Sequence, residues 1–399
     1  MARPKFPEFV ALMAALMSLG ALTIDAMLPA LGEIGTDLGV ERENDVQLIV
    51  ALYFLGFSSG QLFYGPLSDS VGRKRALLVG LGVYMVGCLL SLFGATFSAM
   101  LGGRLLQGLG VCAGRIVSMA IIRDQYQGRQ MARVMSFAMA VFIIVPIIAP
   151  SLGQAILLFI DWRGIFVAFL ALALAASLWF LLRQPETLPE DKRLAFTFSR
   201  IWLGFGEVLK NRVAFGYTVV AGLAFGGFLA YLSSAQQIFQ VQYGLGAKFP
   251  LYFAGLSLSL GVASLSNTQL VMRFGMKPLA RAALVGLAVL SAGFFVAAQA
   301  AEGQPPLWSL VVYLSLVFFC QGVLYGNVNS IAMEPLGHIA GIGAAVIGAL
   351  SMGISIGAGT WIGQSYDGTV LPLVLGFGVL GVLGLGAMFW TERSWAVES

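Results

Sequence analysis

Charge is scarce in this sequence. Only 11% of its 399 residues are Asp, Glu, Lys or Arg, whereas 58% are hydrophobic, and the mean hydropathy is +0.87. A soluble globule of this length needs more polar surface than such a chain supplies, so a soluble fold is excluded. The apolar runs are unbroken and far longer than the alternating strands of about 10 residues in a lipid-facing barrel. They therefore predict membrane-spanning helices in a lipid bilayer.

Cysteine and histidine are nearly absent. The three cysteines, Cys88, Cys112 and Cys320, lie far apart inside apolar runs, and His338 is the only histidine. This pattern excludes a disulfide framework and a metal cluster, and it argues against an enzyme, which would need a nucleophile and a base within the spans. The Gly-rich, Lys-Ser/Thr loop that binds ATP is missing too, so an ion gradient must drive any transport and no cofactor is expected. Basic loops at a membrane account for the net charge of +4 without a nucleic-acid partner.

Twelve apolar runs are long enough to cross a bilayer, since a span needs about 20 residues. The longest polar segment, residues 184–212, separates the sixth run from the seventh. The predicted organisation is therefore a six-helix bundle in residues 1–183, a linker, and a second six-helix bundle in residues 213–399. The expected spans are 8–30, 47–65, 76–97, 99–122, 132–157, 163–183, 213–236, 249–272, 277–299, 307–332, 339–364 and 371–390.

The basic residues support this count of spans. Alternate loops beginning at the N-terminus carry 18 of the lysines and arginines, and the remaining loops carry only Arg42, Arg163 and Lys248. A miscounted helix would have mixed the two sets. By the positive-inside rule, both termini and the linker are expected in the cytoplasm.

A short polar segment occurs twice, the second time in degraded form. Residues 65–75 interrupt two apolar runs with three consecutive cations, which predicts a loop at a membrane face. Residues 272–277 occupy the equivalent place in the second half, with Gly275 where the first copy has Gly72. Such a repeat predicts two pseudo-symmetric bundles with a substrate site between them near the midplane. The alternative is a coincidence between two basic loops.

Three ionisable side chains lie well inside predicted spans: Asp25, Arg104 and Arg115. Burying each costs several kcal/mol unless it is paired or faces water, so each is a functional candidate, with a fixed ion pair between helices as the structural alternative. At about 1.5 Å per residue, Asp25 and Arg104 lie at nearly one depth and could pair. Arg115 shares a helix face with Arg104 and Gln107 but lies about 16 Å deeper, which predicts a water-filled cavity or a substrate group as its partner.

The neighbouring Asp25 and Arg104 indicate a site for proton coupling. Apolar surroundings favour the protonated form of a carboxyl group, and a nearby arginine favours the charged form. Opening the site to one side and then to the other would change this balance. We therefore expect Asp25 to take up a proton outside and to release it inside, in competition with a substrate.

Aromatic and amide side chains in the spans are the other candidates for a substrate site. Mostly apolar walls with a few polar groups suit drug-like ligands, although packing or lipid contact explains each side chain equally well when it is taken alone. Together with Asp25 and Arg115, the candidates are Tyr53, Phe54, Gln107, Phe142, Tyr231, Gln236, Tyr325, Asn327, Asn329 and Trp361.

Several motifs resemble those of the major facilitator superfamily. The segment Gly65–Arg75 fills the pattern of its loop between helices two and three, and Arg104-Leu105-Leu106-Gln107-Gly108 resembles a motif of its proton-driven members. Residues 149–154 resemble the Gly-Pro-rich motif that its drug exporters carry in helix five. Further matches are similar to its Bcr/CflA branch of bacterial drug:proton antiporters, and these are Asp25 with Pro29, Asp161-Trp162-Arg163, and residues 333–341.

The resemblance implies an all-α integral membrane protein with the major facilitator fold, acting as a monomer in the bacterial inner membrane. It implies exchange of small, largely apolar antimicrobial drugs for protons. It also implies a conformational latch of Gly65, Asp69, Gly72, Arg73 and Asp124, in which Arg73 meets Asp124 and Asp69 faces the helix that starts near residue 341.

Two alternatives to drug export stay open. A carrier of one endogenous metabolite, such as a sugar or an organic anion, would use Arg115 as its anchor. A sensor or scaffold that transports nothing would not need Asp25 in hydrocarbon.

Overall fold

The computed structural model describes residues 4–393, apart from the side chains of residues 132, 139, 142, 143 and 200. The described residues form helices joined by short connections. The chain divides into two compact units, and the boundary falls between Ser199 and Arg200, inside the segment 184–212 that the sequence predicts to be a linker.

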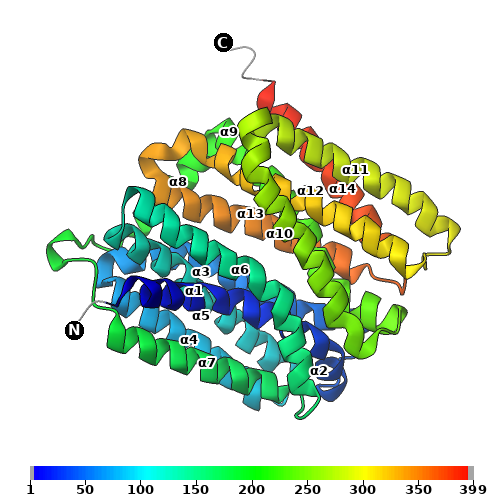
Figure 1. Ribbon diagram of the computed structural model, residues 1–399, viewed down its shortest axis with the longest axis horizontal. Helices are drawn as coiled ribbons and strands as arrows, with labels where there is room; N and C mark the ends of the chain where they lie inside the picture. The colour runs from blue at the N-terminus through cyan, green and yellow to red at the C-terminus, as the bar shows by residue number, and fades with distance from the viewer. Residues whose placement is uncertain (1–3, 394–399) are drawn as a thin grey trace. The chain divides into compact units, whose positions relative to one another are not determined.

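From residue 4 onward, the first unit contains six long helices, which lie side by side and are coloured blue to green in Figure 1. Short elements connect some of them: η1 (Leu28–Ala30) and α2 (Leu31–Asp37) follow the first helix, η2 (Glu43–Gln47) precedes the second, and η3 (Glu190–Lys192) lies in the linker. The long helices are α1 (Phe6–Asp25), α3 (Leu48–Val71), α4 (Arg73–Phe93), α5 (Phe97–Gln125), α6 (Gly128–Leu157) and α7 (Arg163–Arg183).

Up to residue 393, the second unit also contains six long helices, preceded by the shorter α8 (Phe198–Lys210) of the linker. Three short elements are η4 (Gln237–Gln242), a π-helical continuation of the first long helix, η5 (Gly246–Lys248) and η6 (Glu334–Ile339). The long helices are α9 (Arg212–Gln236), α10 (Phe249–Phe274), α11 (Met276–Ala300), α12 (Leu307–Met333), α13 (Ala340–Gln364) and α14 (Leu371–Glu392).

The predicted all-helical membrane fold is confirmed. Within the described part of the chain, ten segments are long and apolar enough to cross a membrane, and one of them, Leu307–Gln364, comprises both α12 and α13. Helix α6 contributes the shorter apolar stretch Ile144–Leu157. The first span differs from the prediction, because α1 ends at Asp25 and the chain continues through η1 and α2. The cause is Pro29, which has no N–H to bond the carbonyl of Asp25 four residues earlier.

The predicted internal repeat is present in the packing. Helix α1 packs on α5 and α6, and its counterpart α9 packs on α12 and α13. Likewise α5 packs on α3 and α4, and α12 packs on α10 and α11. The two joints also share a backbone conformation, since Gly72 has φ 98° and ψ 154° and Gly275 has φ 81° and ψ 164°. Each unit therefore repeats one arrangement of six helices.

The prediction of a loop at residues 65–75 is wrong. Helix α3 continues to Val71 and α4 begins at Arg73, so Gly72 alone makes the joint. Its positive φ is readily available to glycine, and a Cβ there would lie 2.5 Å from Glu186 Oε2. The polar residues on either side can be helical because side chains of this unit and its linker satisfy them.

Helices α3 and α5 cross at very short range, and this crossing carries two of the candidate residues, Tyr53 and Arg104. A Cβ at Gly56 would lie 2.0 Å from the carbonyl oxygen of Leu105. A Cβ at Gly108 would lie 1.9 Å from the carbonyl oxygen of Tyr53. Glycine at both positions lets the two backbones touch, which is how helices associate closely in a membrane.

We expect Gly108→Ala to destabilise the protein by about 1–3 kcal/mol, because the added methyl group forces two backbones apart. Gly82→Ala in α4 is the matched control, since a Cβ there meets no atom within 4 Å. Thermal unfolding in detergent can be followed with a dye that reacts with the buried thiols of Cys88 and Cys112 as they become exposed. Equal unfolding temperatures for the two variants would contradict the packing described here.

Candidate functional site

The broken end of α1 is where the predicted acid lies. Asp25 is the last residue of the helix, and its side chain is buried, with 5% of the residue exposed. The following residues Met27 and Leu28 are fully buried as well. A helix end in such surroundings leaves backbone carbonyls that need donors from elsewhere.

Helix α6 closes over this end. A Cβ at Gly153 would lie 1.7 Å from the carbonyl oxygen of Ala26, the residue next to Asp25. Ala149, one turn earlier in the same segment, is fully buried. The segment 149–154, which resembles the exporters' helix-five motif, therefore places its glycine directly against the backbone beside the acid.

Arg104 supplies the donors that the end of α1 needs. Its Nη1 donates to the carbonyl of Thr23 at 3.4 Å and to Gln107 Oε1 at 2.6 Å, and its Nε donates to the carbonyl of Ile49 at 3.4 Å. The side chain is fully buried. One guanidinium group thus joins α5 to α1 and α3.

Two tyrosines complete the packing around this arginine. The guanidinium of Arg104 lies over the ring of Tyr53, 4.6 Å from its centre, and Tyr53 donates to the carbonyl of Gly20 at 2.8 Å. The hydroxyl groups of Tyr84 and Thr23 are 2.7 Å apart. The cation is therefore held by an aromatic face and by neutral oxygens, without a carboxylate.

The ion pair that depth arithmetic allowed between Asp25 and Arg104 is not formed. Within residues 4–393, Asp25 makes no hydrogen bond and no ion pair, and neither Arg104 Nη2 nor Gln107 Nε2 has a hydrogen-bond partner. Arg104 instead bonds the carbonyl of Thr23 at the end of α1, the carbonyl of Ile49 in α3 and the side chain of Gln107. The end of α1 thus carries a buried acid, and the arginine that bonds this end keeps one donor without a partner.

The structure separates the other candidates of the first unit. Phe54 packs edge-on against Tyr53, with ring centres 5.7 Å apart, so it belongs to the same region. Arg115 is exposed, unlike Arg104 on the same helix. The side chain of Phe142 lies outside the part of the chain that the structure describes.

In the second unit, Tyr231 lies at the centre of an aromatic cluster. Its ring centre is 4.8 Å from that of Phe318 and 5.9 Å from that of Phe253, and Phe228 lies 5.6 Å from Phe318. Helices α9, α10 and α12 contribute these rings. The cluster is apolar, apart from the hydroxyl group of the buried tyrosine.

The remaining candidates of the second unit do not form one group. Asn327 donates to Asn267 Oδ1 at 2.8 Å and is buried, whereas Asn329 donates to the carbonyl of Tyr325 in its own helix. Gln236 is buried at the end of α9, just before the π-helical turn. Exposure is 36% for Tyr325 and 72% for Trp361, which sets these two apart from the buried residues.

A second polar region lies at the other end of the first unit, where α4 begins. Arg73 donates from Nε to Asp124 Oδ2 at 3.0 Å and from Nη1 to Ser68 Oγ at 2.8 Å and to Asp69. The contact between Arg73 and Asp124 that the family resemblance implied is therefore confirmed. Gly65 contributes only its carbonyl, which accepts from Ser68 Oγ, since a Cβ there would meet nothing within 4 Å.

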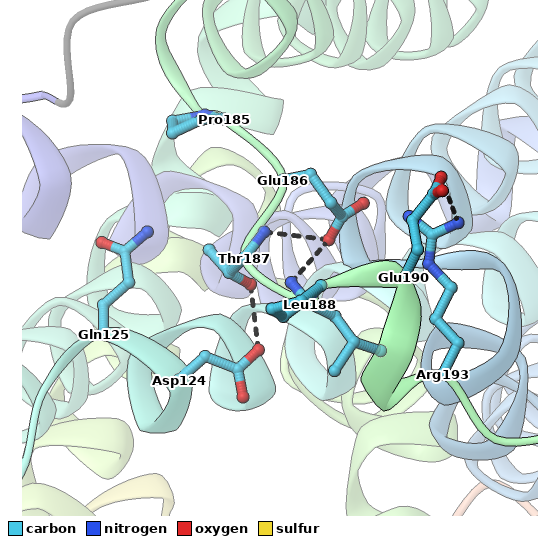
Figure 2. Close-up of a pocket in the computed structure, with 9 residues that line it drawn as sticks. Asp124, Gln125, Pro185, Glu186, Thr187, Leu188, Glu190 and Arg193 are labelled. Carbon is cyan, nitrogen blue, oxygen red and sulfur yellow. Dashed lines mark hydrogen bonds and ion pairs between the residues drawn. The ribbon is translucent and has the colours of Figure 1, made fainter.

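The first residues of the linker wrap around this region, and Figure 2 shows them around a pocket of about 500 Å³. Thr187 donates to Asp124 Oδ2 at 2.9 Å. Glu186 accepts from the backbone N–H groups of Arg73 and Lys74 at 2.9 and 3.1 Å. The linker is thus bonded to the start of α4 and to the end of α5.

Trp162 and Arg163 hold Asp37 at the end of the first unit opposite to the start of α4. Trp162 donates from Nε1 to Asp37 Oδ2 at 3.0 Å, and Arg163 donates to the same oxygen at 2.7 Å. The guanidinium of Arg163 stacks on the indole ring at 4.1 Å. These contacts give the Asp-Trp-Arg segment before α7 a structural role, because they fasten α2 to α7.

Sequence reasoning missed several of these residues. Thr23 and Tyr84 each carry a hydroxyl group inside an apolar span, which is only a weak indication of a functional site. Glu186 follows Pro185, three residues after the last residue of a span, and a carboxylate in such a place could have suggested a helix cap. Among the described residues, no group of three or more His, Cys, Asp or Glu side chains could hold a metal ion.

These features define a class of protein: a helical membrane transporter built from two repeated six-helix units. The family profile described as Major Facilitator Superfamily matches residues 10–360. The chain therefore belongs to the major facilitator superfamily.

Relatives match over nearly the whole chain. An uncharacterised MFS-type transporter of Bacillus subtilis is 31% identical over 95% of this chain and 94% of its own length. A bicyclomycin resistance protein homolog of Haemophilus influenzae is 27% identical, with coverage of 97% and 96%, and multidrug resistance protein D of Escherichia coli is 26% identical, with coverage of 96% and 93%. The xylose transporter XylE of E. coli shares the fold, with a TM-score of 0.74 at 14% identity over 96% of this chain and 97% of that one.

Arg104→Lys is expected to lower the free energy of unfolding by about 2–3 kcal/mol, because a lysine keeps the charge but cannot bond the carbonyls of Thr23 and Ile49 together with Gln107. Arg115→Lys, a change of the same type at an exposed position of the same helix, should leave stability nearly unchanged. Unfolding temperatures of the purified variants in detergent measure both effects. A stable Arg104→Lys protein would show that the arginine does not hold the end of α1.

Proposed function

We propose that this protein expels small, largely apolar antimicrobial compounds across the bacterial inner membrane in exchange for protons. The observation that carries the proposal is Asp25, a carboxyl group that is 5% exposed and that has no bonded partner among the described residues. The substrate class is supported by relatives that are named for resistance to bicyclomycin or to several drugs and that match over more than nine-tenths of the chain.

Asp25 is the residue that carries the proton. A buried carboxylate without a partner costs several kcal/mol, so a closed site favours the neutral acid. The carboxyl group also lies at the C-terminal end of α1, where the helix dipole opposes negative charge. Water that enters from one side lets the group ionise, and a cycle of opening and closing then moves one proton inward.

Arg104 tunes this exchange without neutralising the acid. Its fork bonds the carbonyls of Thr23 and Ile49 and the side chain of Gln107, so its charge is fixed at the end of α1 while Asp25 stays unbonded among the described residues. The spare donors Arg104 Nη2 and Gln107 Nε2 are suited to a water molecule or to an oxygen of the drug. Proton and drug then compete for one polar region.

Apolar and aromatic side chains supply most of the drug contacts. Rings offer large contact areas and adapt to different ligands, which suits a transporter with several substrates. The aromatic cluster around Tyr231 supports this assignment in the second unit. The proposed contacts are Asp25, Tyr53, Phe54, Gln107, Arg115 and Phe142 in the first unit, and Tyr231, Gln236, Tyr325, Asn327, Asn329 and Trp361 in the second.

The latch residues control which side of the membrane is open. We assign the ends of the units that carry most lysines and arginines to the cytoplasm, together with both termini, following the positive-inside rule. Contacts of Arg73 with Asp69 and Asp124 favour the outward-open form, and their loss favours the inward-open form. The proton gradient drives the cycle without a cofactor, and the protein acts as a monomer.

Asp25→Asn should reduce drug-coupled proton movement to the level of protein-free vesicles, because the amide cannot exchange a proton. The measurement uses purified protein in vesicles with an imposed pH gradient, with internal pH recorded as neutral, cationic and anionic drugs are added. Drug binding to the unaltered protein should weaken at low pH, since the proton displaces the drug, whereas binding to the variant should not depend on pH.

Asp191→Asn, which removes an exposed acid from the linker, serves as the control and should transport normally. Full proton-driven export by Asp25→Asn would refute the role of the acid. Movement driven by a sodium gradient alone would reassign the coupling ion. A response to one sugar or organic anion and to no drug would favour a metabolite carrier instead.

A further inference from the structure

The segment of residues 184–194, here named the linker strap, begins where α7 ends and crosses the start of α4. Glu186 Oε1 accepts from the backbone N–H of Arg73 at 2.9 Å, and Oε2 accepts from the backbone N–H of Lys74 at 3.1 Å. The first N–H groups of a helix have no partner within it, and the helix dipole favours an anion there. Glu186 thus caps α4 from more than a hundred residues further along the chain.

Two features keep this carboxylate in place. The backbone N–H groups of Thr187 and Leu188 donate to Glu186 Oε1 at 2.9 and 3.0 Å, so the strap folds around its own acid. Gly72 leaves the space that the carboxylate occupies, because any larger residue would put its Cβ 2.5 Å from Oε2. Since Gly72 also has no side chain to cap the helix, the cap must come from elsewhere.

The strap also bonds the other members of the latch. Thr187 Oγ1 donates to Asp124 Oδ2 at 2.9 Å, the same oxygen that accepts from Arg73 Nε at 3.0 Å. Further along, the backbone N–H of Leu194 donates to the carbonyl of Asp69 at 2.9 Å. Arg73, Asp124 and Asp69 are therefore each held by a residue of the strap, and Figure 2 shows Thr187 reaching Asp124 beside the pocket.

The position of Arg73 depends on these bonds. The residue is 9% exposed, so its charge needs well-placed acceptors. Its backbone is fixed by Glu186, and its acceptor Asp124 is oriented by Thr187. If the strap were released, both the start of α4 and the carboxylate that Arg73 contacts would lose a partner.

We propose that Glu186 and Thr187 are positioning residues of the latch, so that the first residues of the linker help to hold the outward-open form. The inference rests on the latch role given under the proposed function. Release of the strap then also loosens the latch, because Glu186 bonds Arg73 and Thr187 bonds Asp124, the two residues that form the latch contact.

The test compares Glu186→Gln and Thr187→Val with Glu190→Gln. The control, Glu190→Gln, removes a carboxylate from the same strap. The side chain of Glu190 is 84% exposed and pairs with Arg193 at 3.2 Å. Spin labels on cysteines introduced at the exposed positions Gln130 and Met272, in a background without native cysteines, report the distance between the basic ends of the two units in lipid nanodiscs.

We expect Glu186→Gln to raise the ratio of inward-open to outward-open molecules roughly fivefold, the effect of losing one helix cap. Thr187→Val should raise it by about threefold, and Glu190→Gln should leave it unchanged. In an Asp124→Asn background Thr187→Val should add nothing, because its partner is already altered. A purely structural role would lower the unfolding temperature and leave this ratio as it is.

Equal distance distributions for Glu186→Gln and Glu190→Gln would overturn the inference. If Glu186→Gln does not fold, Thr187→Val and its combination with Asp124→Asn decide the question alone. The distance measurement needs neither drug nor pH gradient. A shifted distribution together with normal export by Asp25→Asn would therefore refute the proton mechanism and leave the strap inference standing.

Discussion

The hydrogen bond from Arg104 to the carbonyl of Thr23 is the interaction on which the candidate site depends. Pro29 cannot continue the helical ladder, so α1 ends inside the protein and leaves backbone oxygens without donors. Arg104 meets part of that need through Nη1, and its Nε bonds the carbonyl of Ile49. Asp25, which follows Thr23 by two residues at the same helix end, is buried and is not bonded to this positive charge.

The two units repeat one helix arrangement but differ in the chemistry they carry. The first has a buried arginine, a buried acid and hydroxyl groups where α1, α3, α4 and α5 pack. The second has rings in the equivalent helices, with Tyr231 surrounded by phenylalanines. At its joint between α10 and α11, Gly275 has nearly the same backbone conformation as Gly72, although Met272 stands where the first copy has Asp69. Backbone geometry has thus been kept where charge has not.

Much of the fold could be predicted from the sequence, because the thickness of a bilayer sets the length of each apolar run. The spans fall within a few residues of α3 to α7 and α9 to α14, and the repeat anticipated the matching joints at Gly72 and Gly275. The polarity of residues 65–75 predicted a loop, whereas the structure has helix on both sides of Gly72. A charged segment can remain helical when its partners come from distant parts of the chain, as Glu186 does here.

The sequence named candidate residues for the site but not the contacts that they make. The position of each residue along its helix predicted that Asp25 and Arg104 lie at nearly one depth, but it could not say which acceptors the guanidinium would bond. That choice depends on the break in α1, whose effect on the carbonyl of Thr23 is visible only in three dimensions. The contact of Arg73 with Asp124 was predicted from the resemblance to the family, because the spacing of the residues in the sequence does not indicate it. Tyr325 and Trp361 showed that composition does not separate an exposed ring from a buried one.

The joint at Gly72 has a mechanical consequence. Because one residue separates α3 from α4, the two helices form lever arms roughly 36 Å and 32 Å long, at about 1.5 Å per residue. A rotation of about 5° at this pivot would displace the far tip of the longer arm by roughly 3 Å. A small rotation at one membrane face would thereby become a larger displacement at the opposite face, without any bending of the helices themselves.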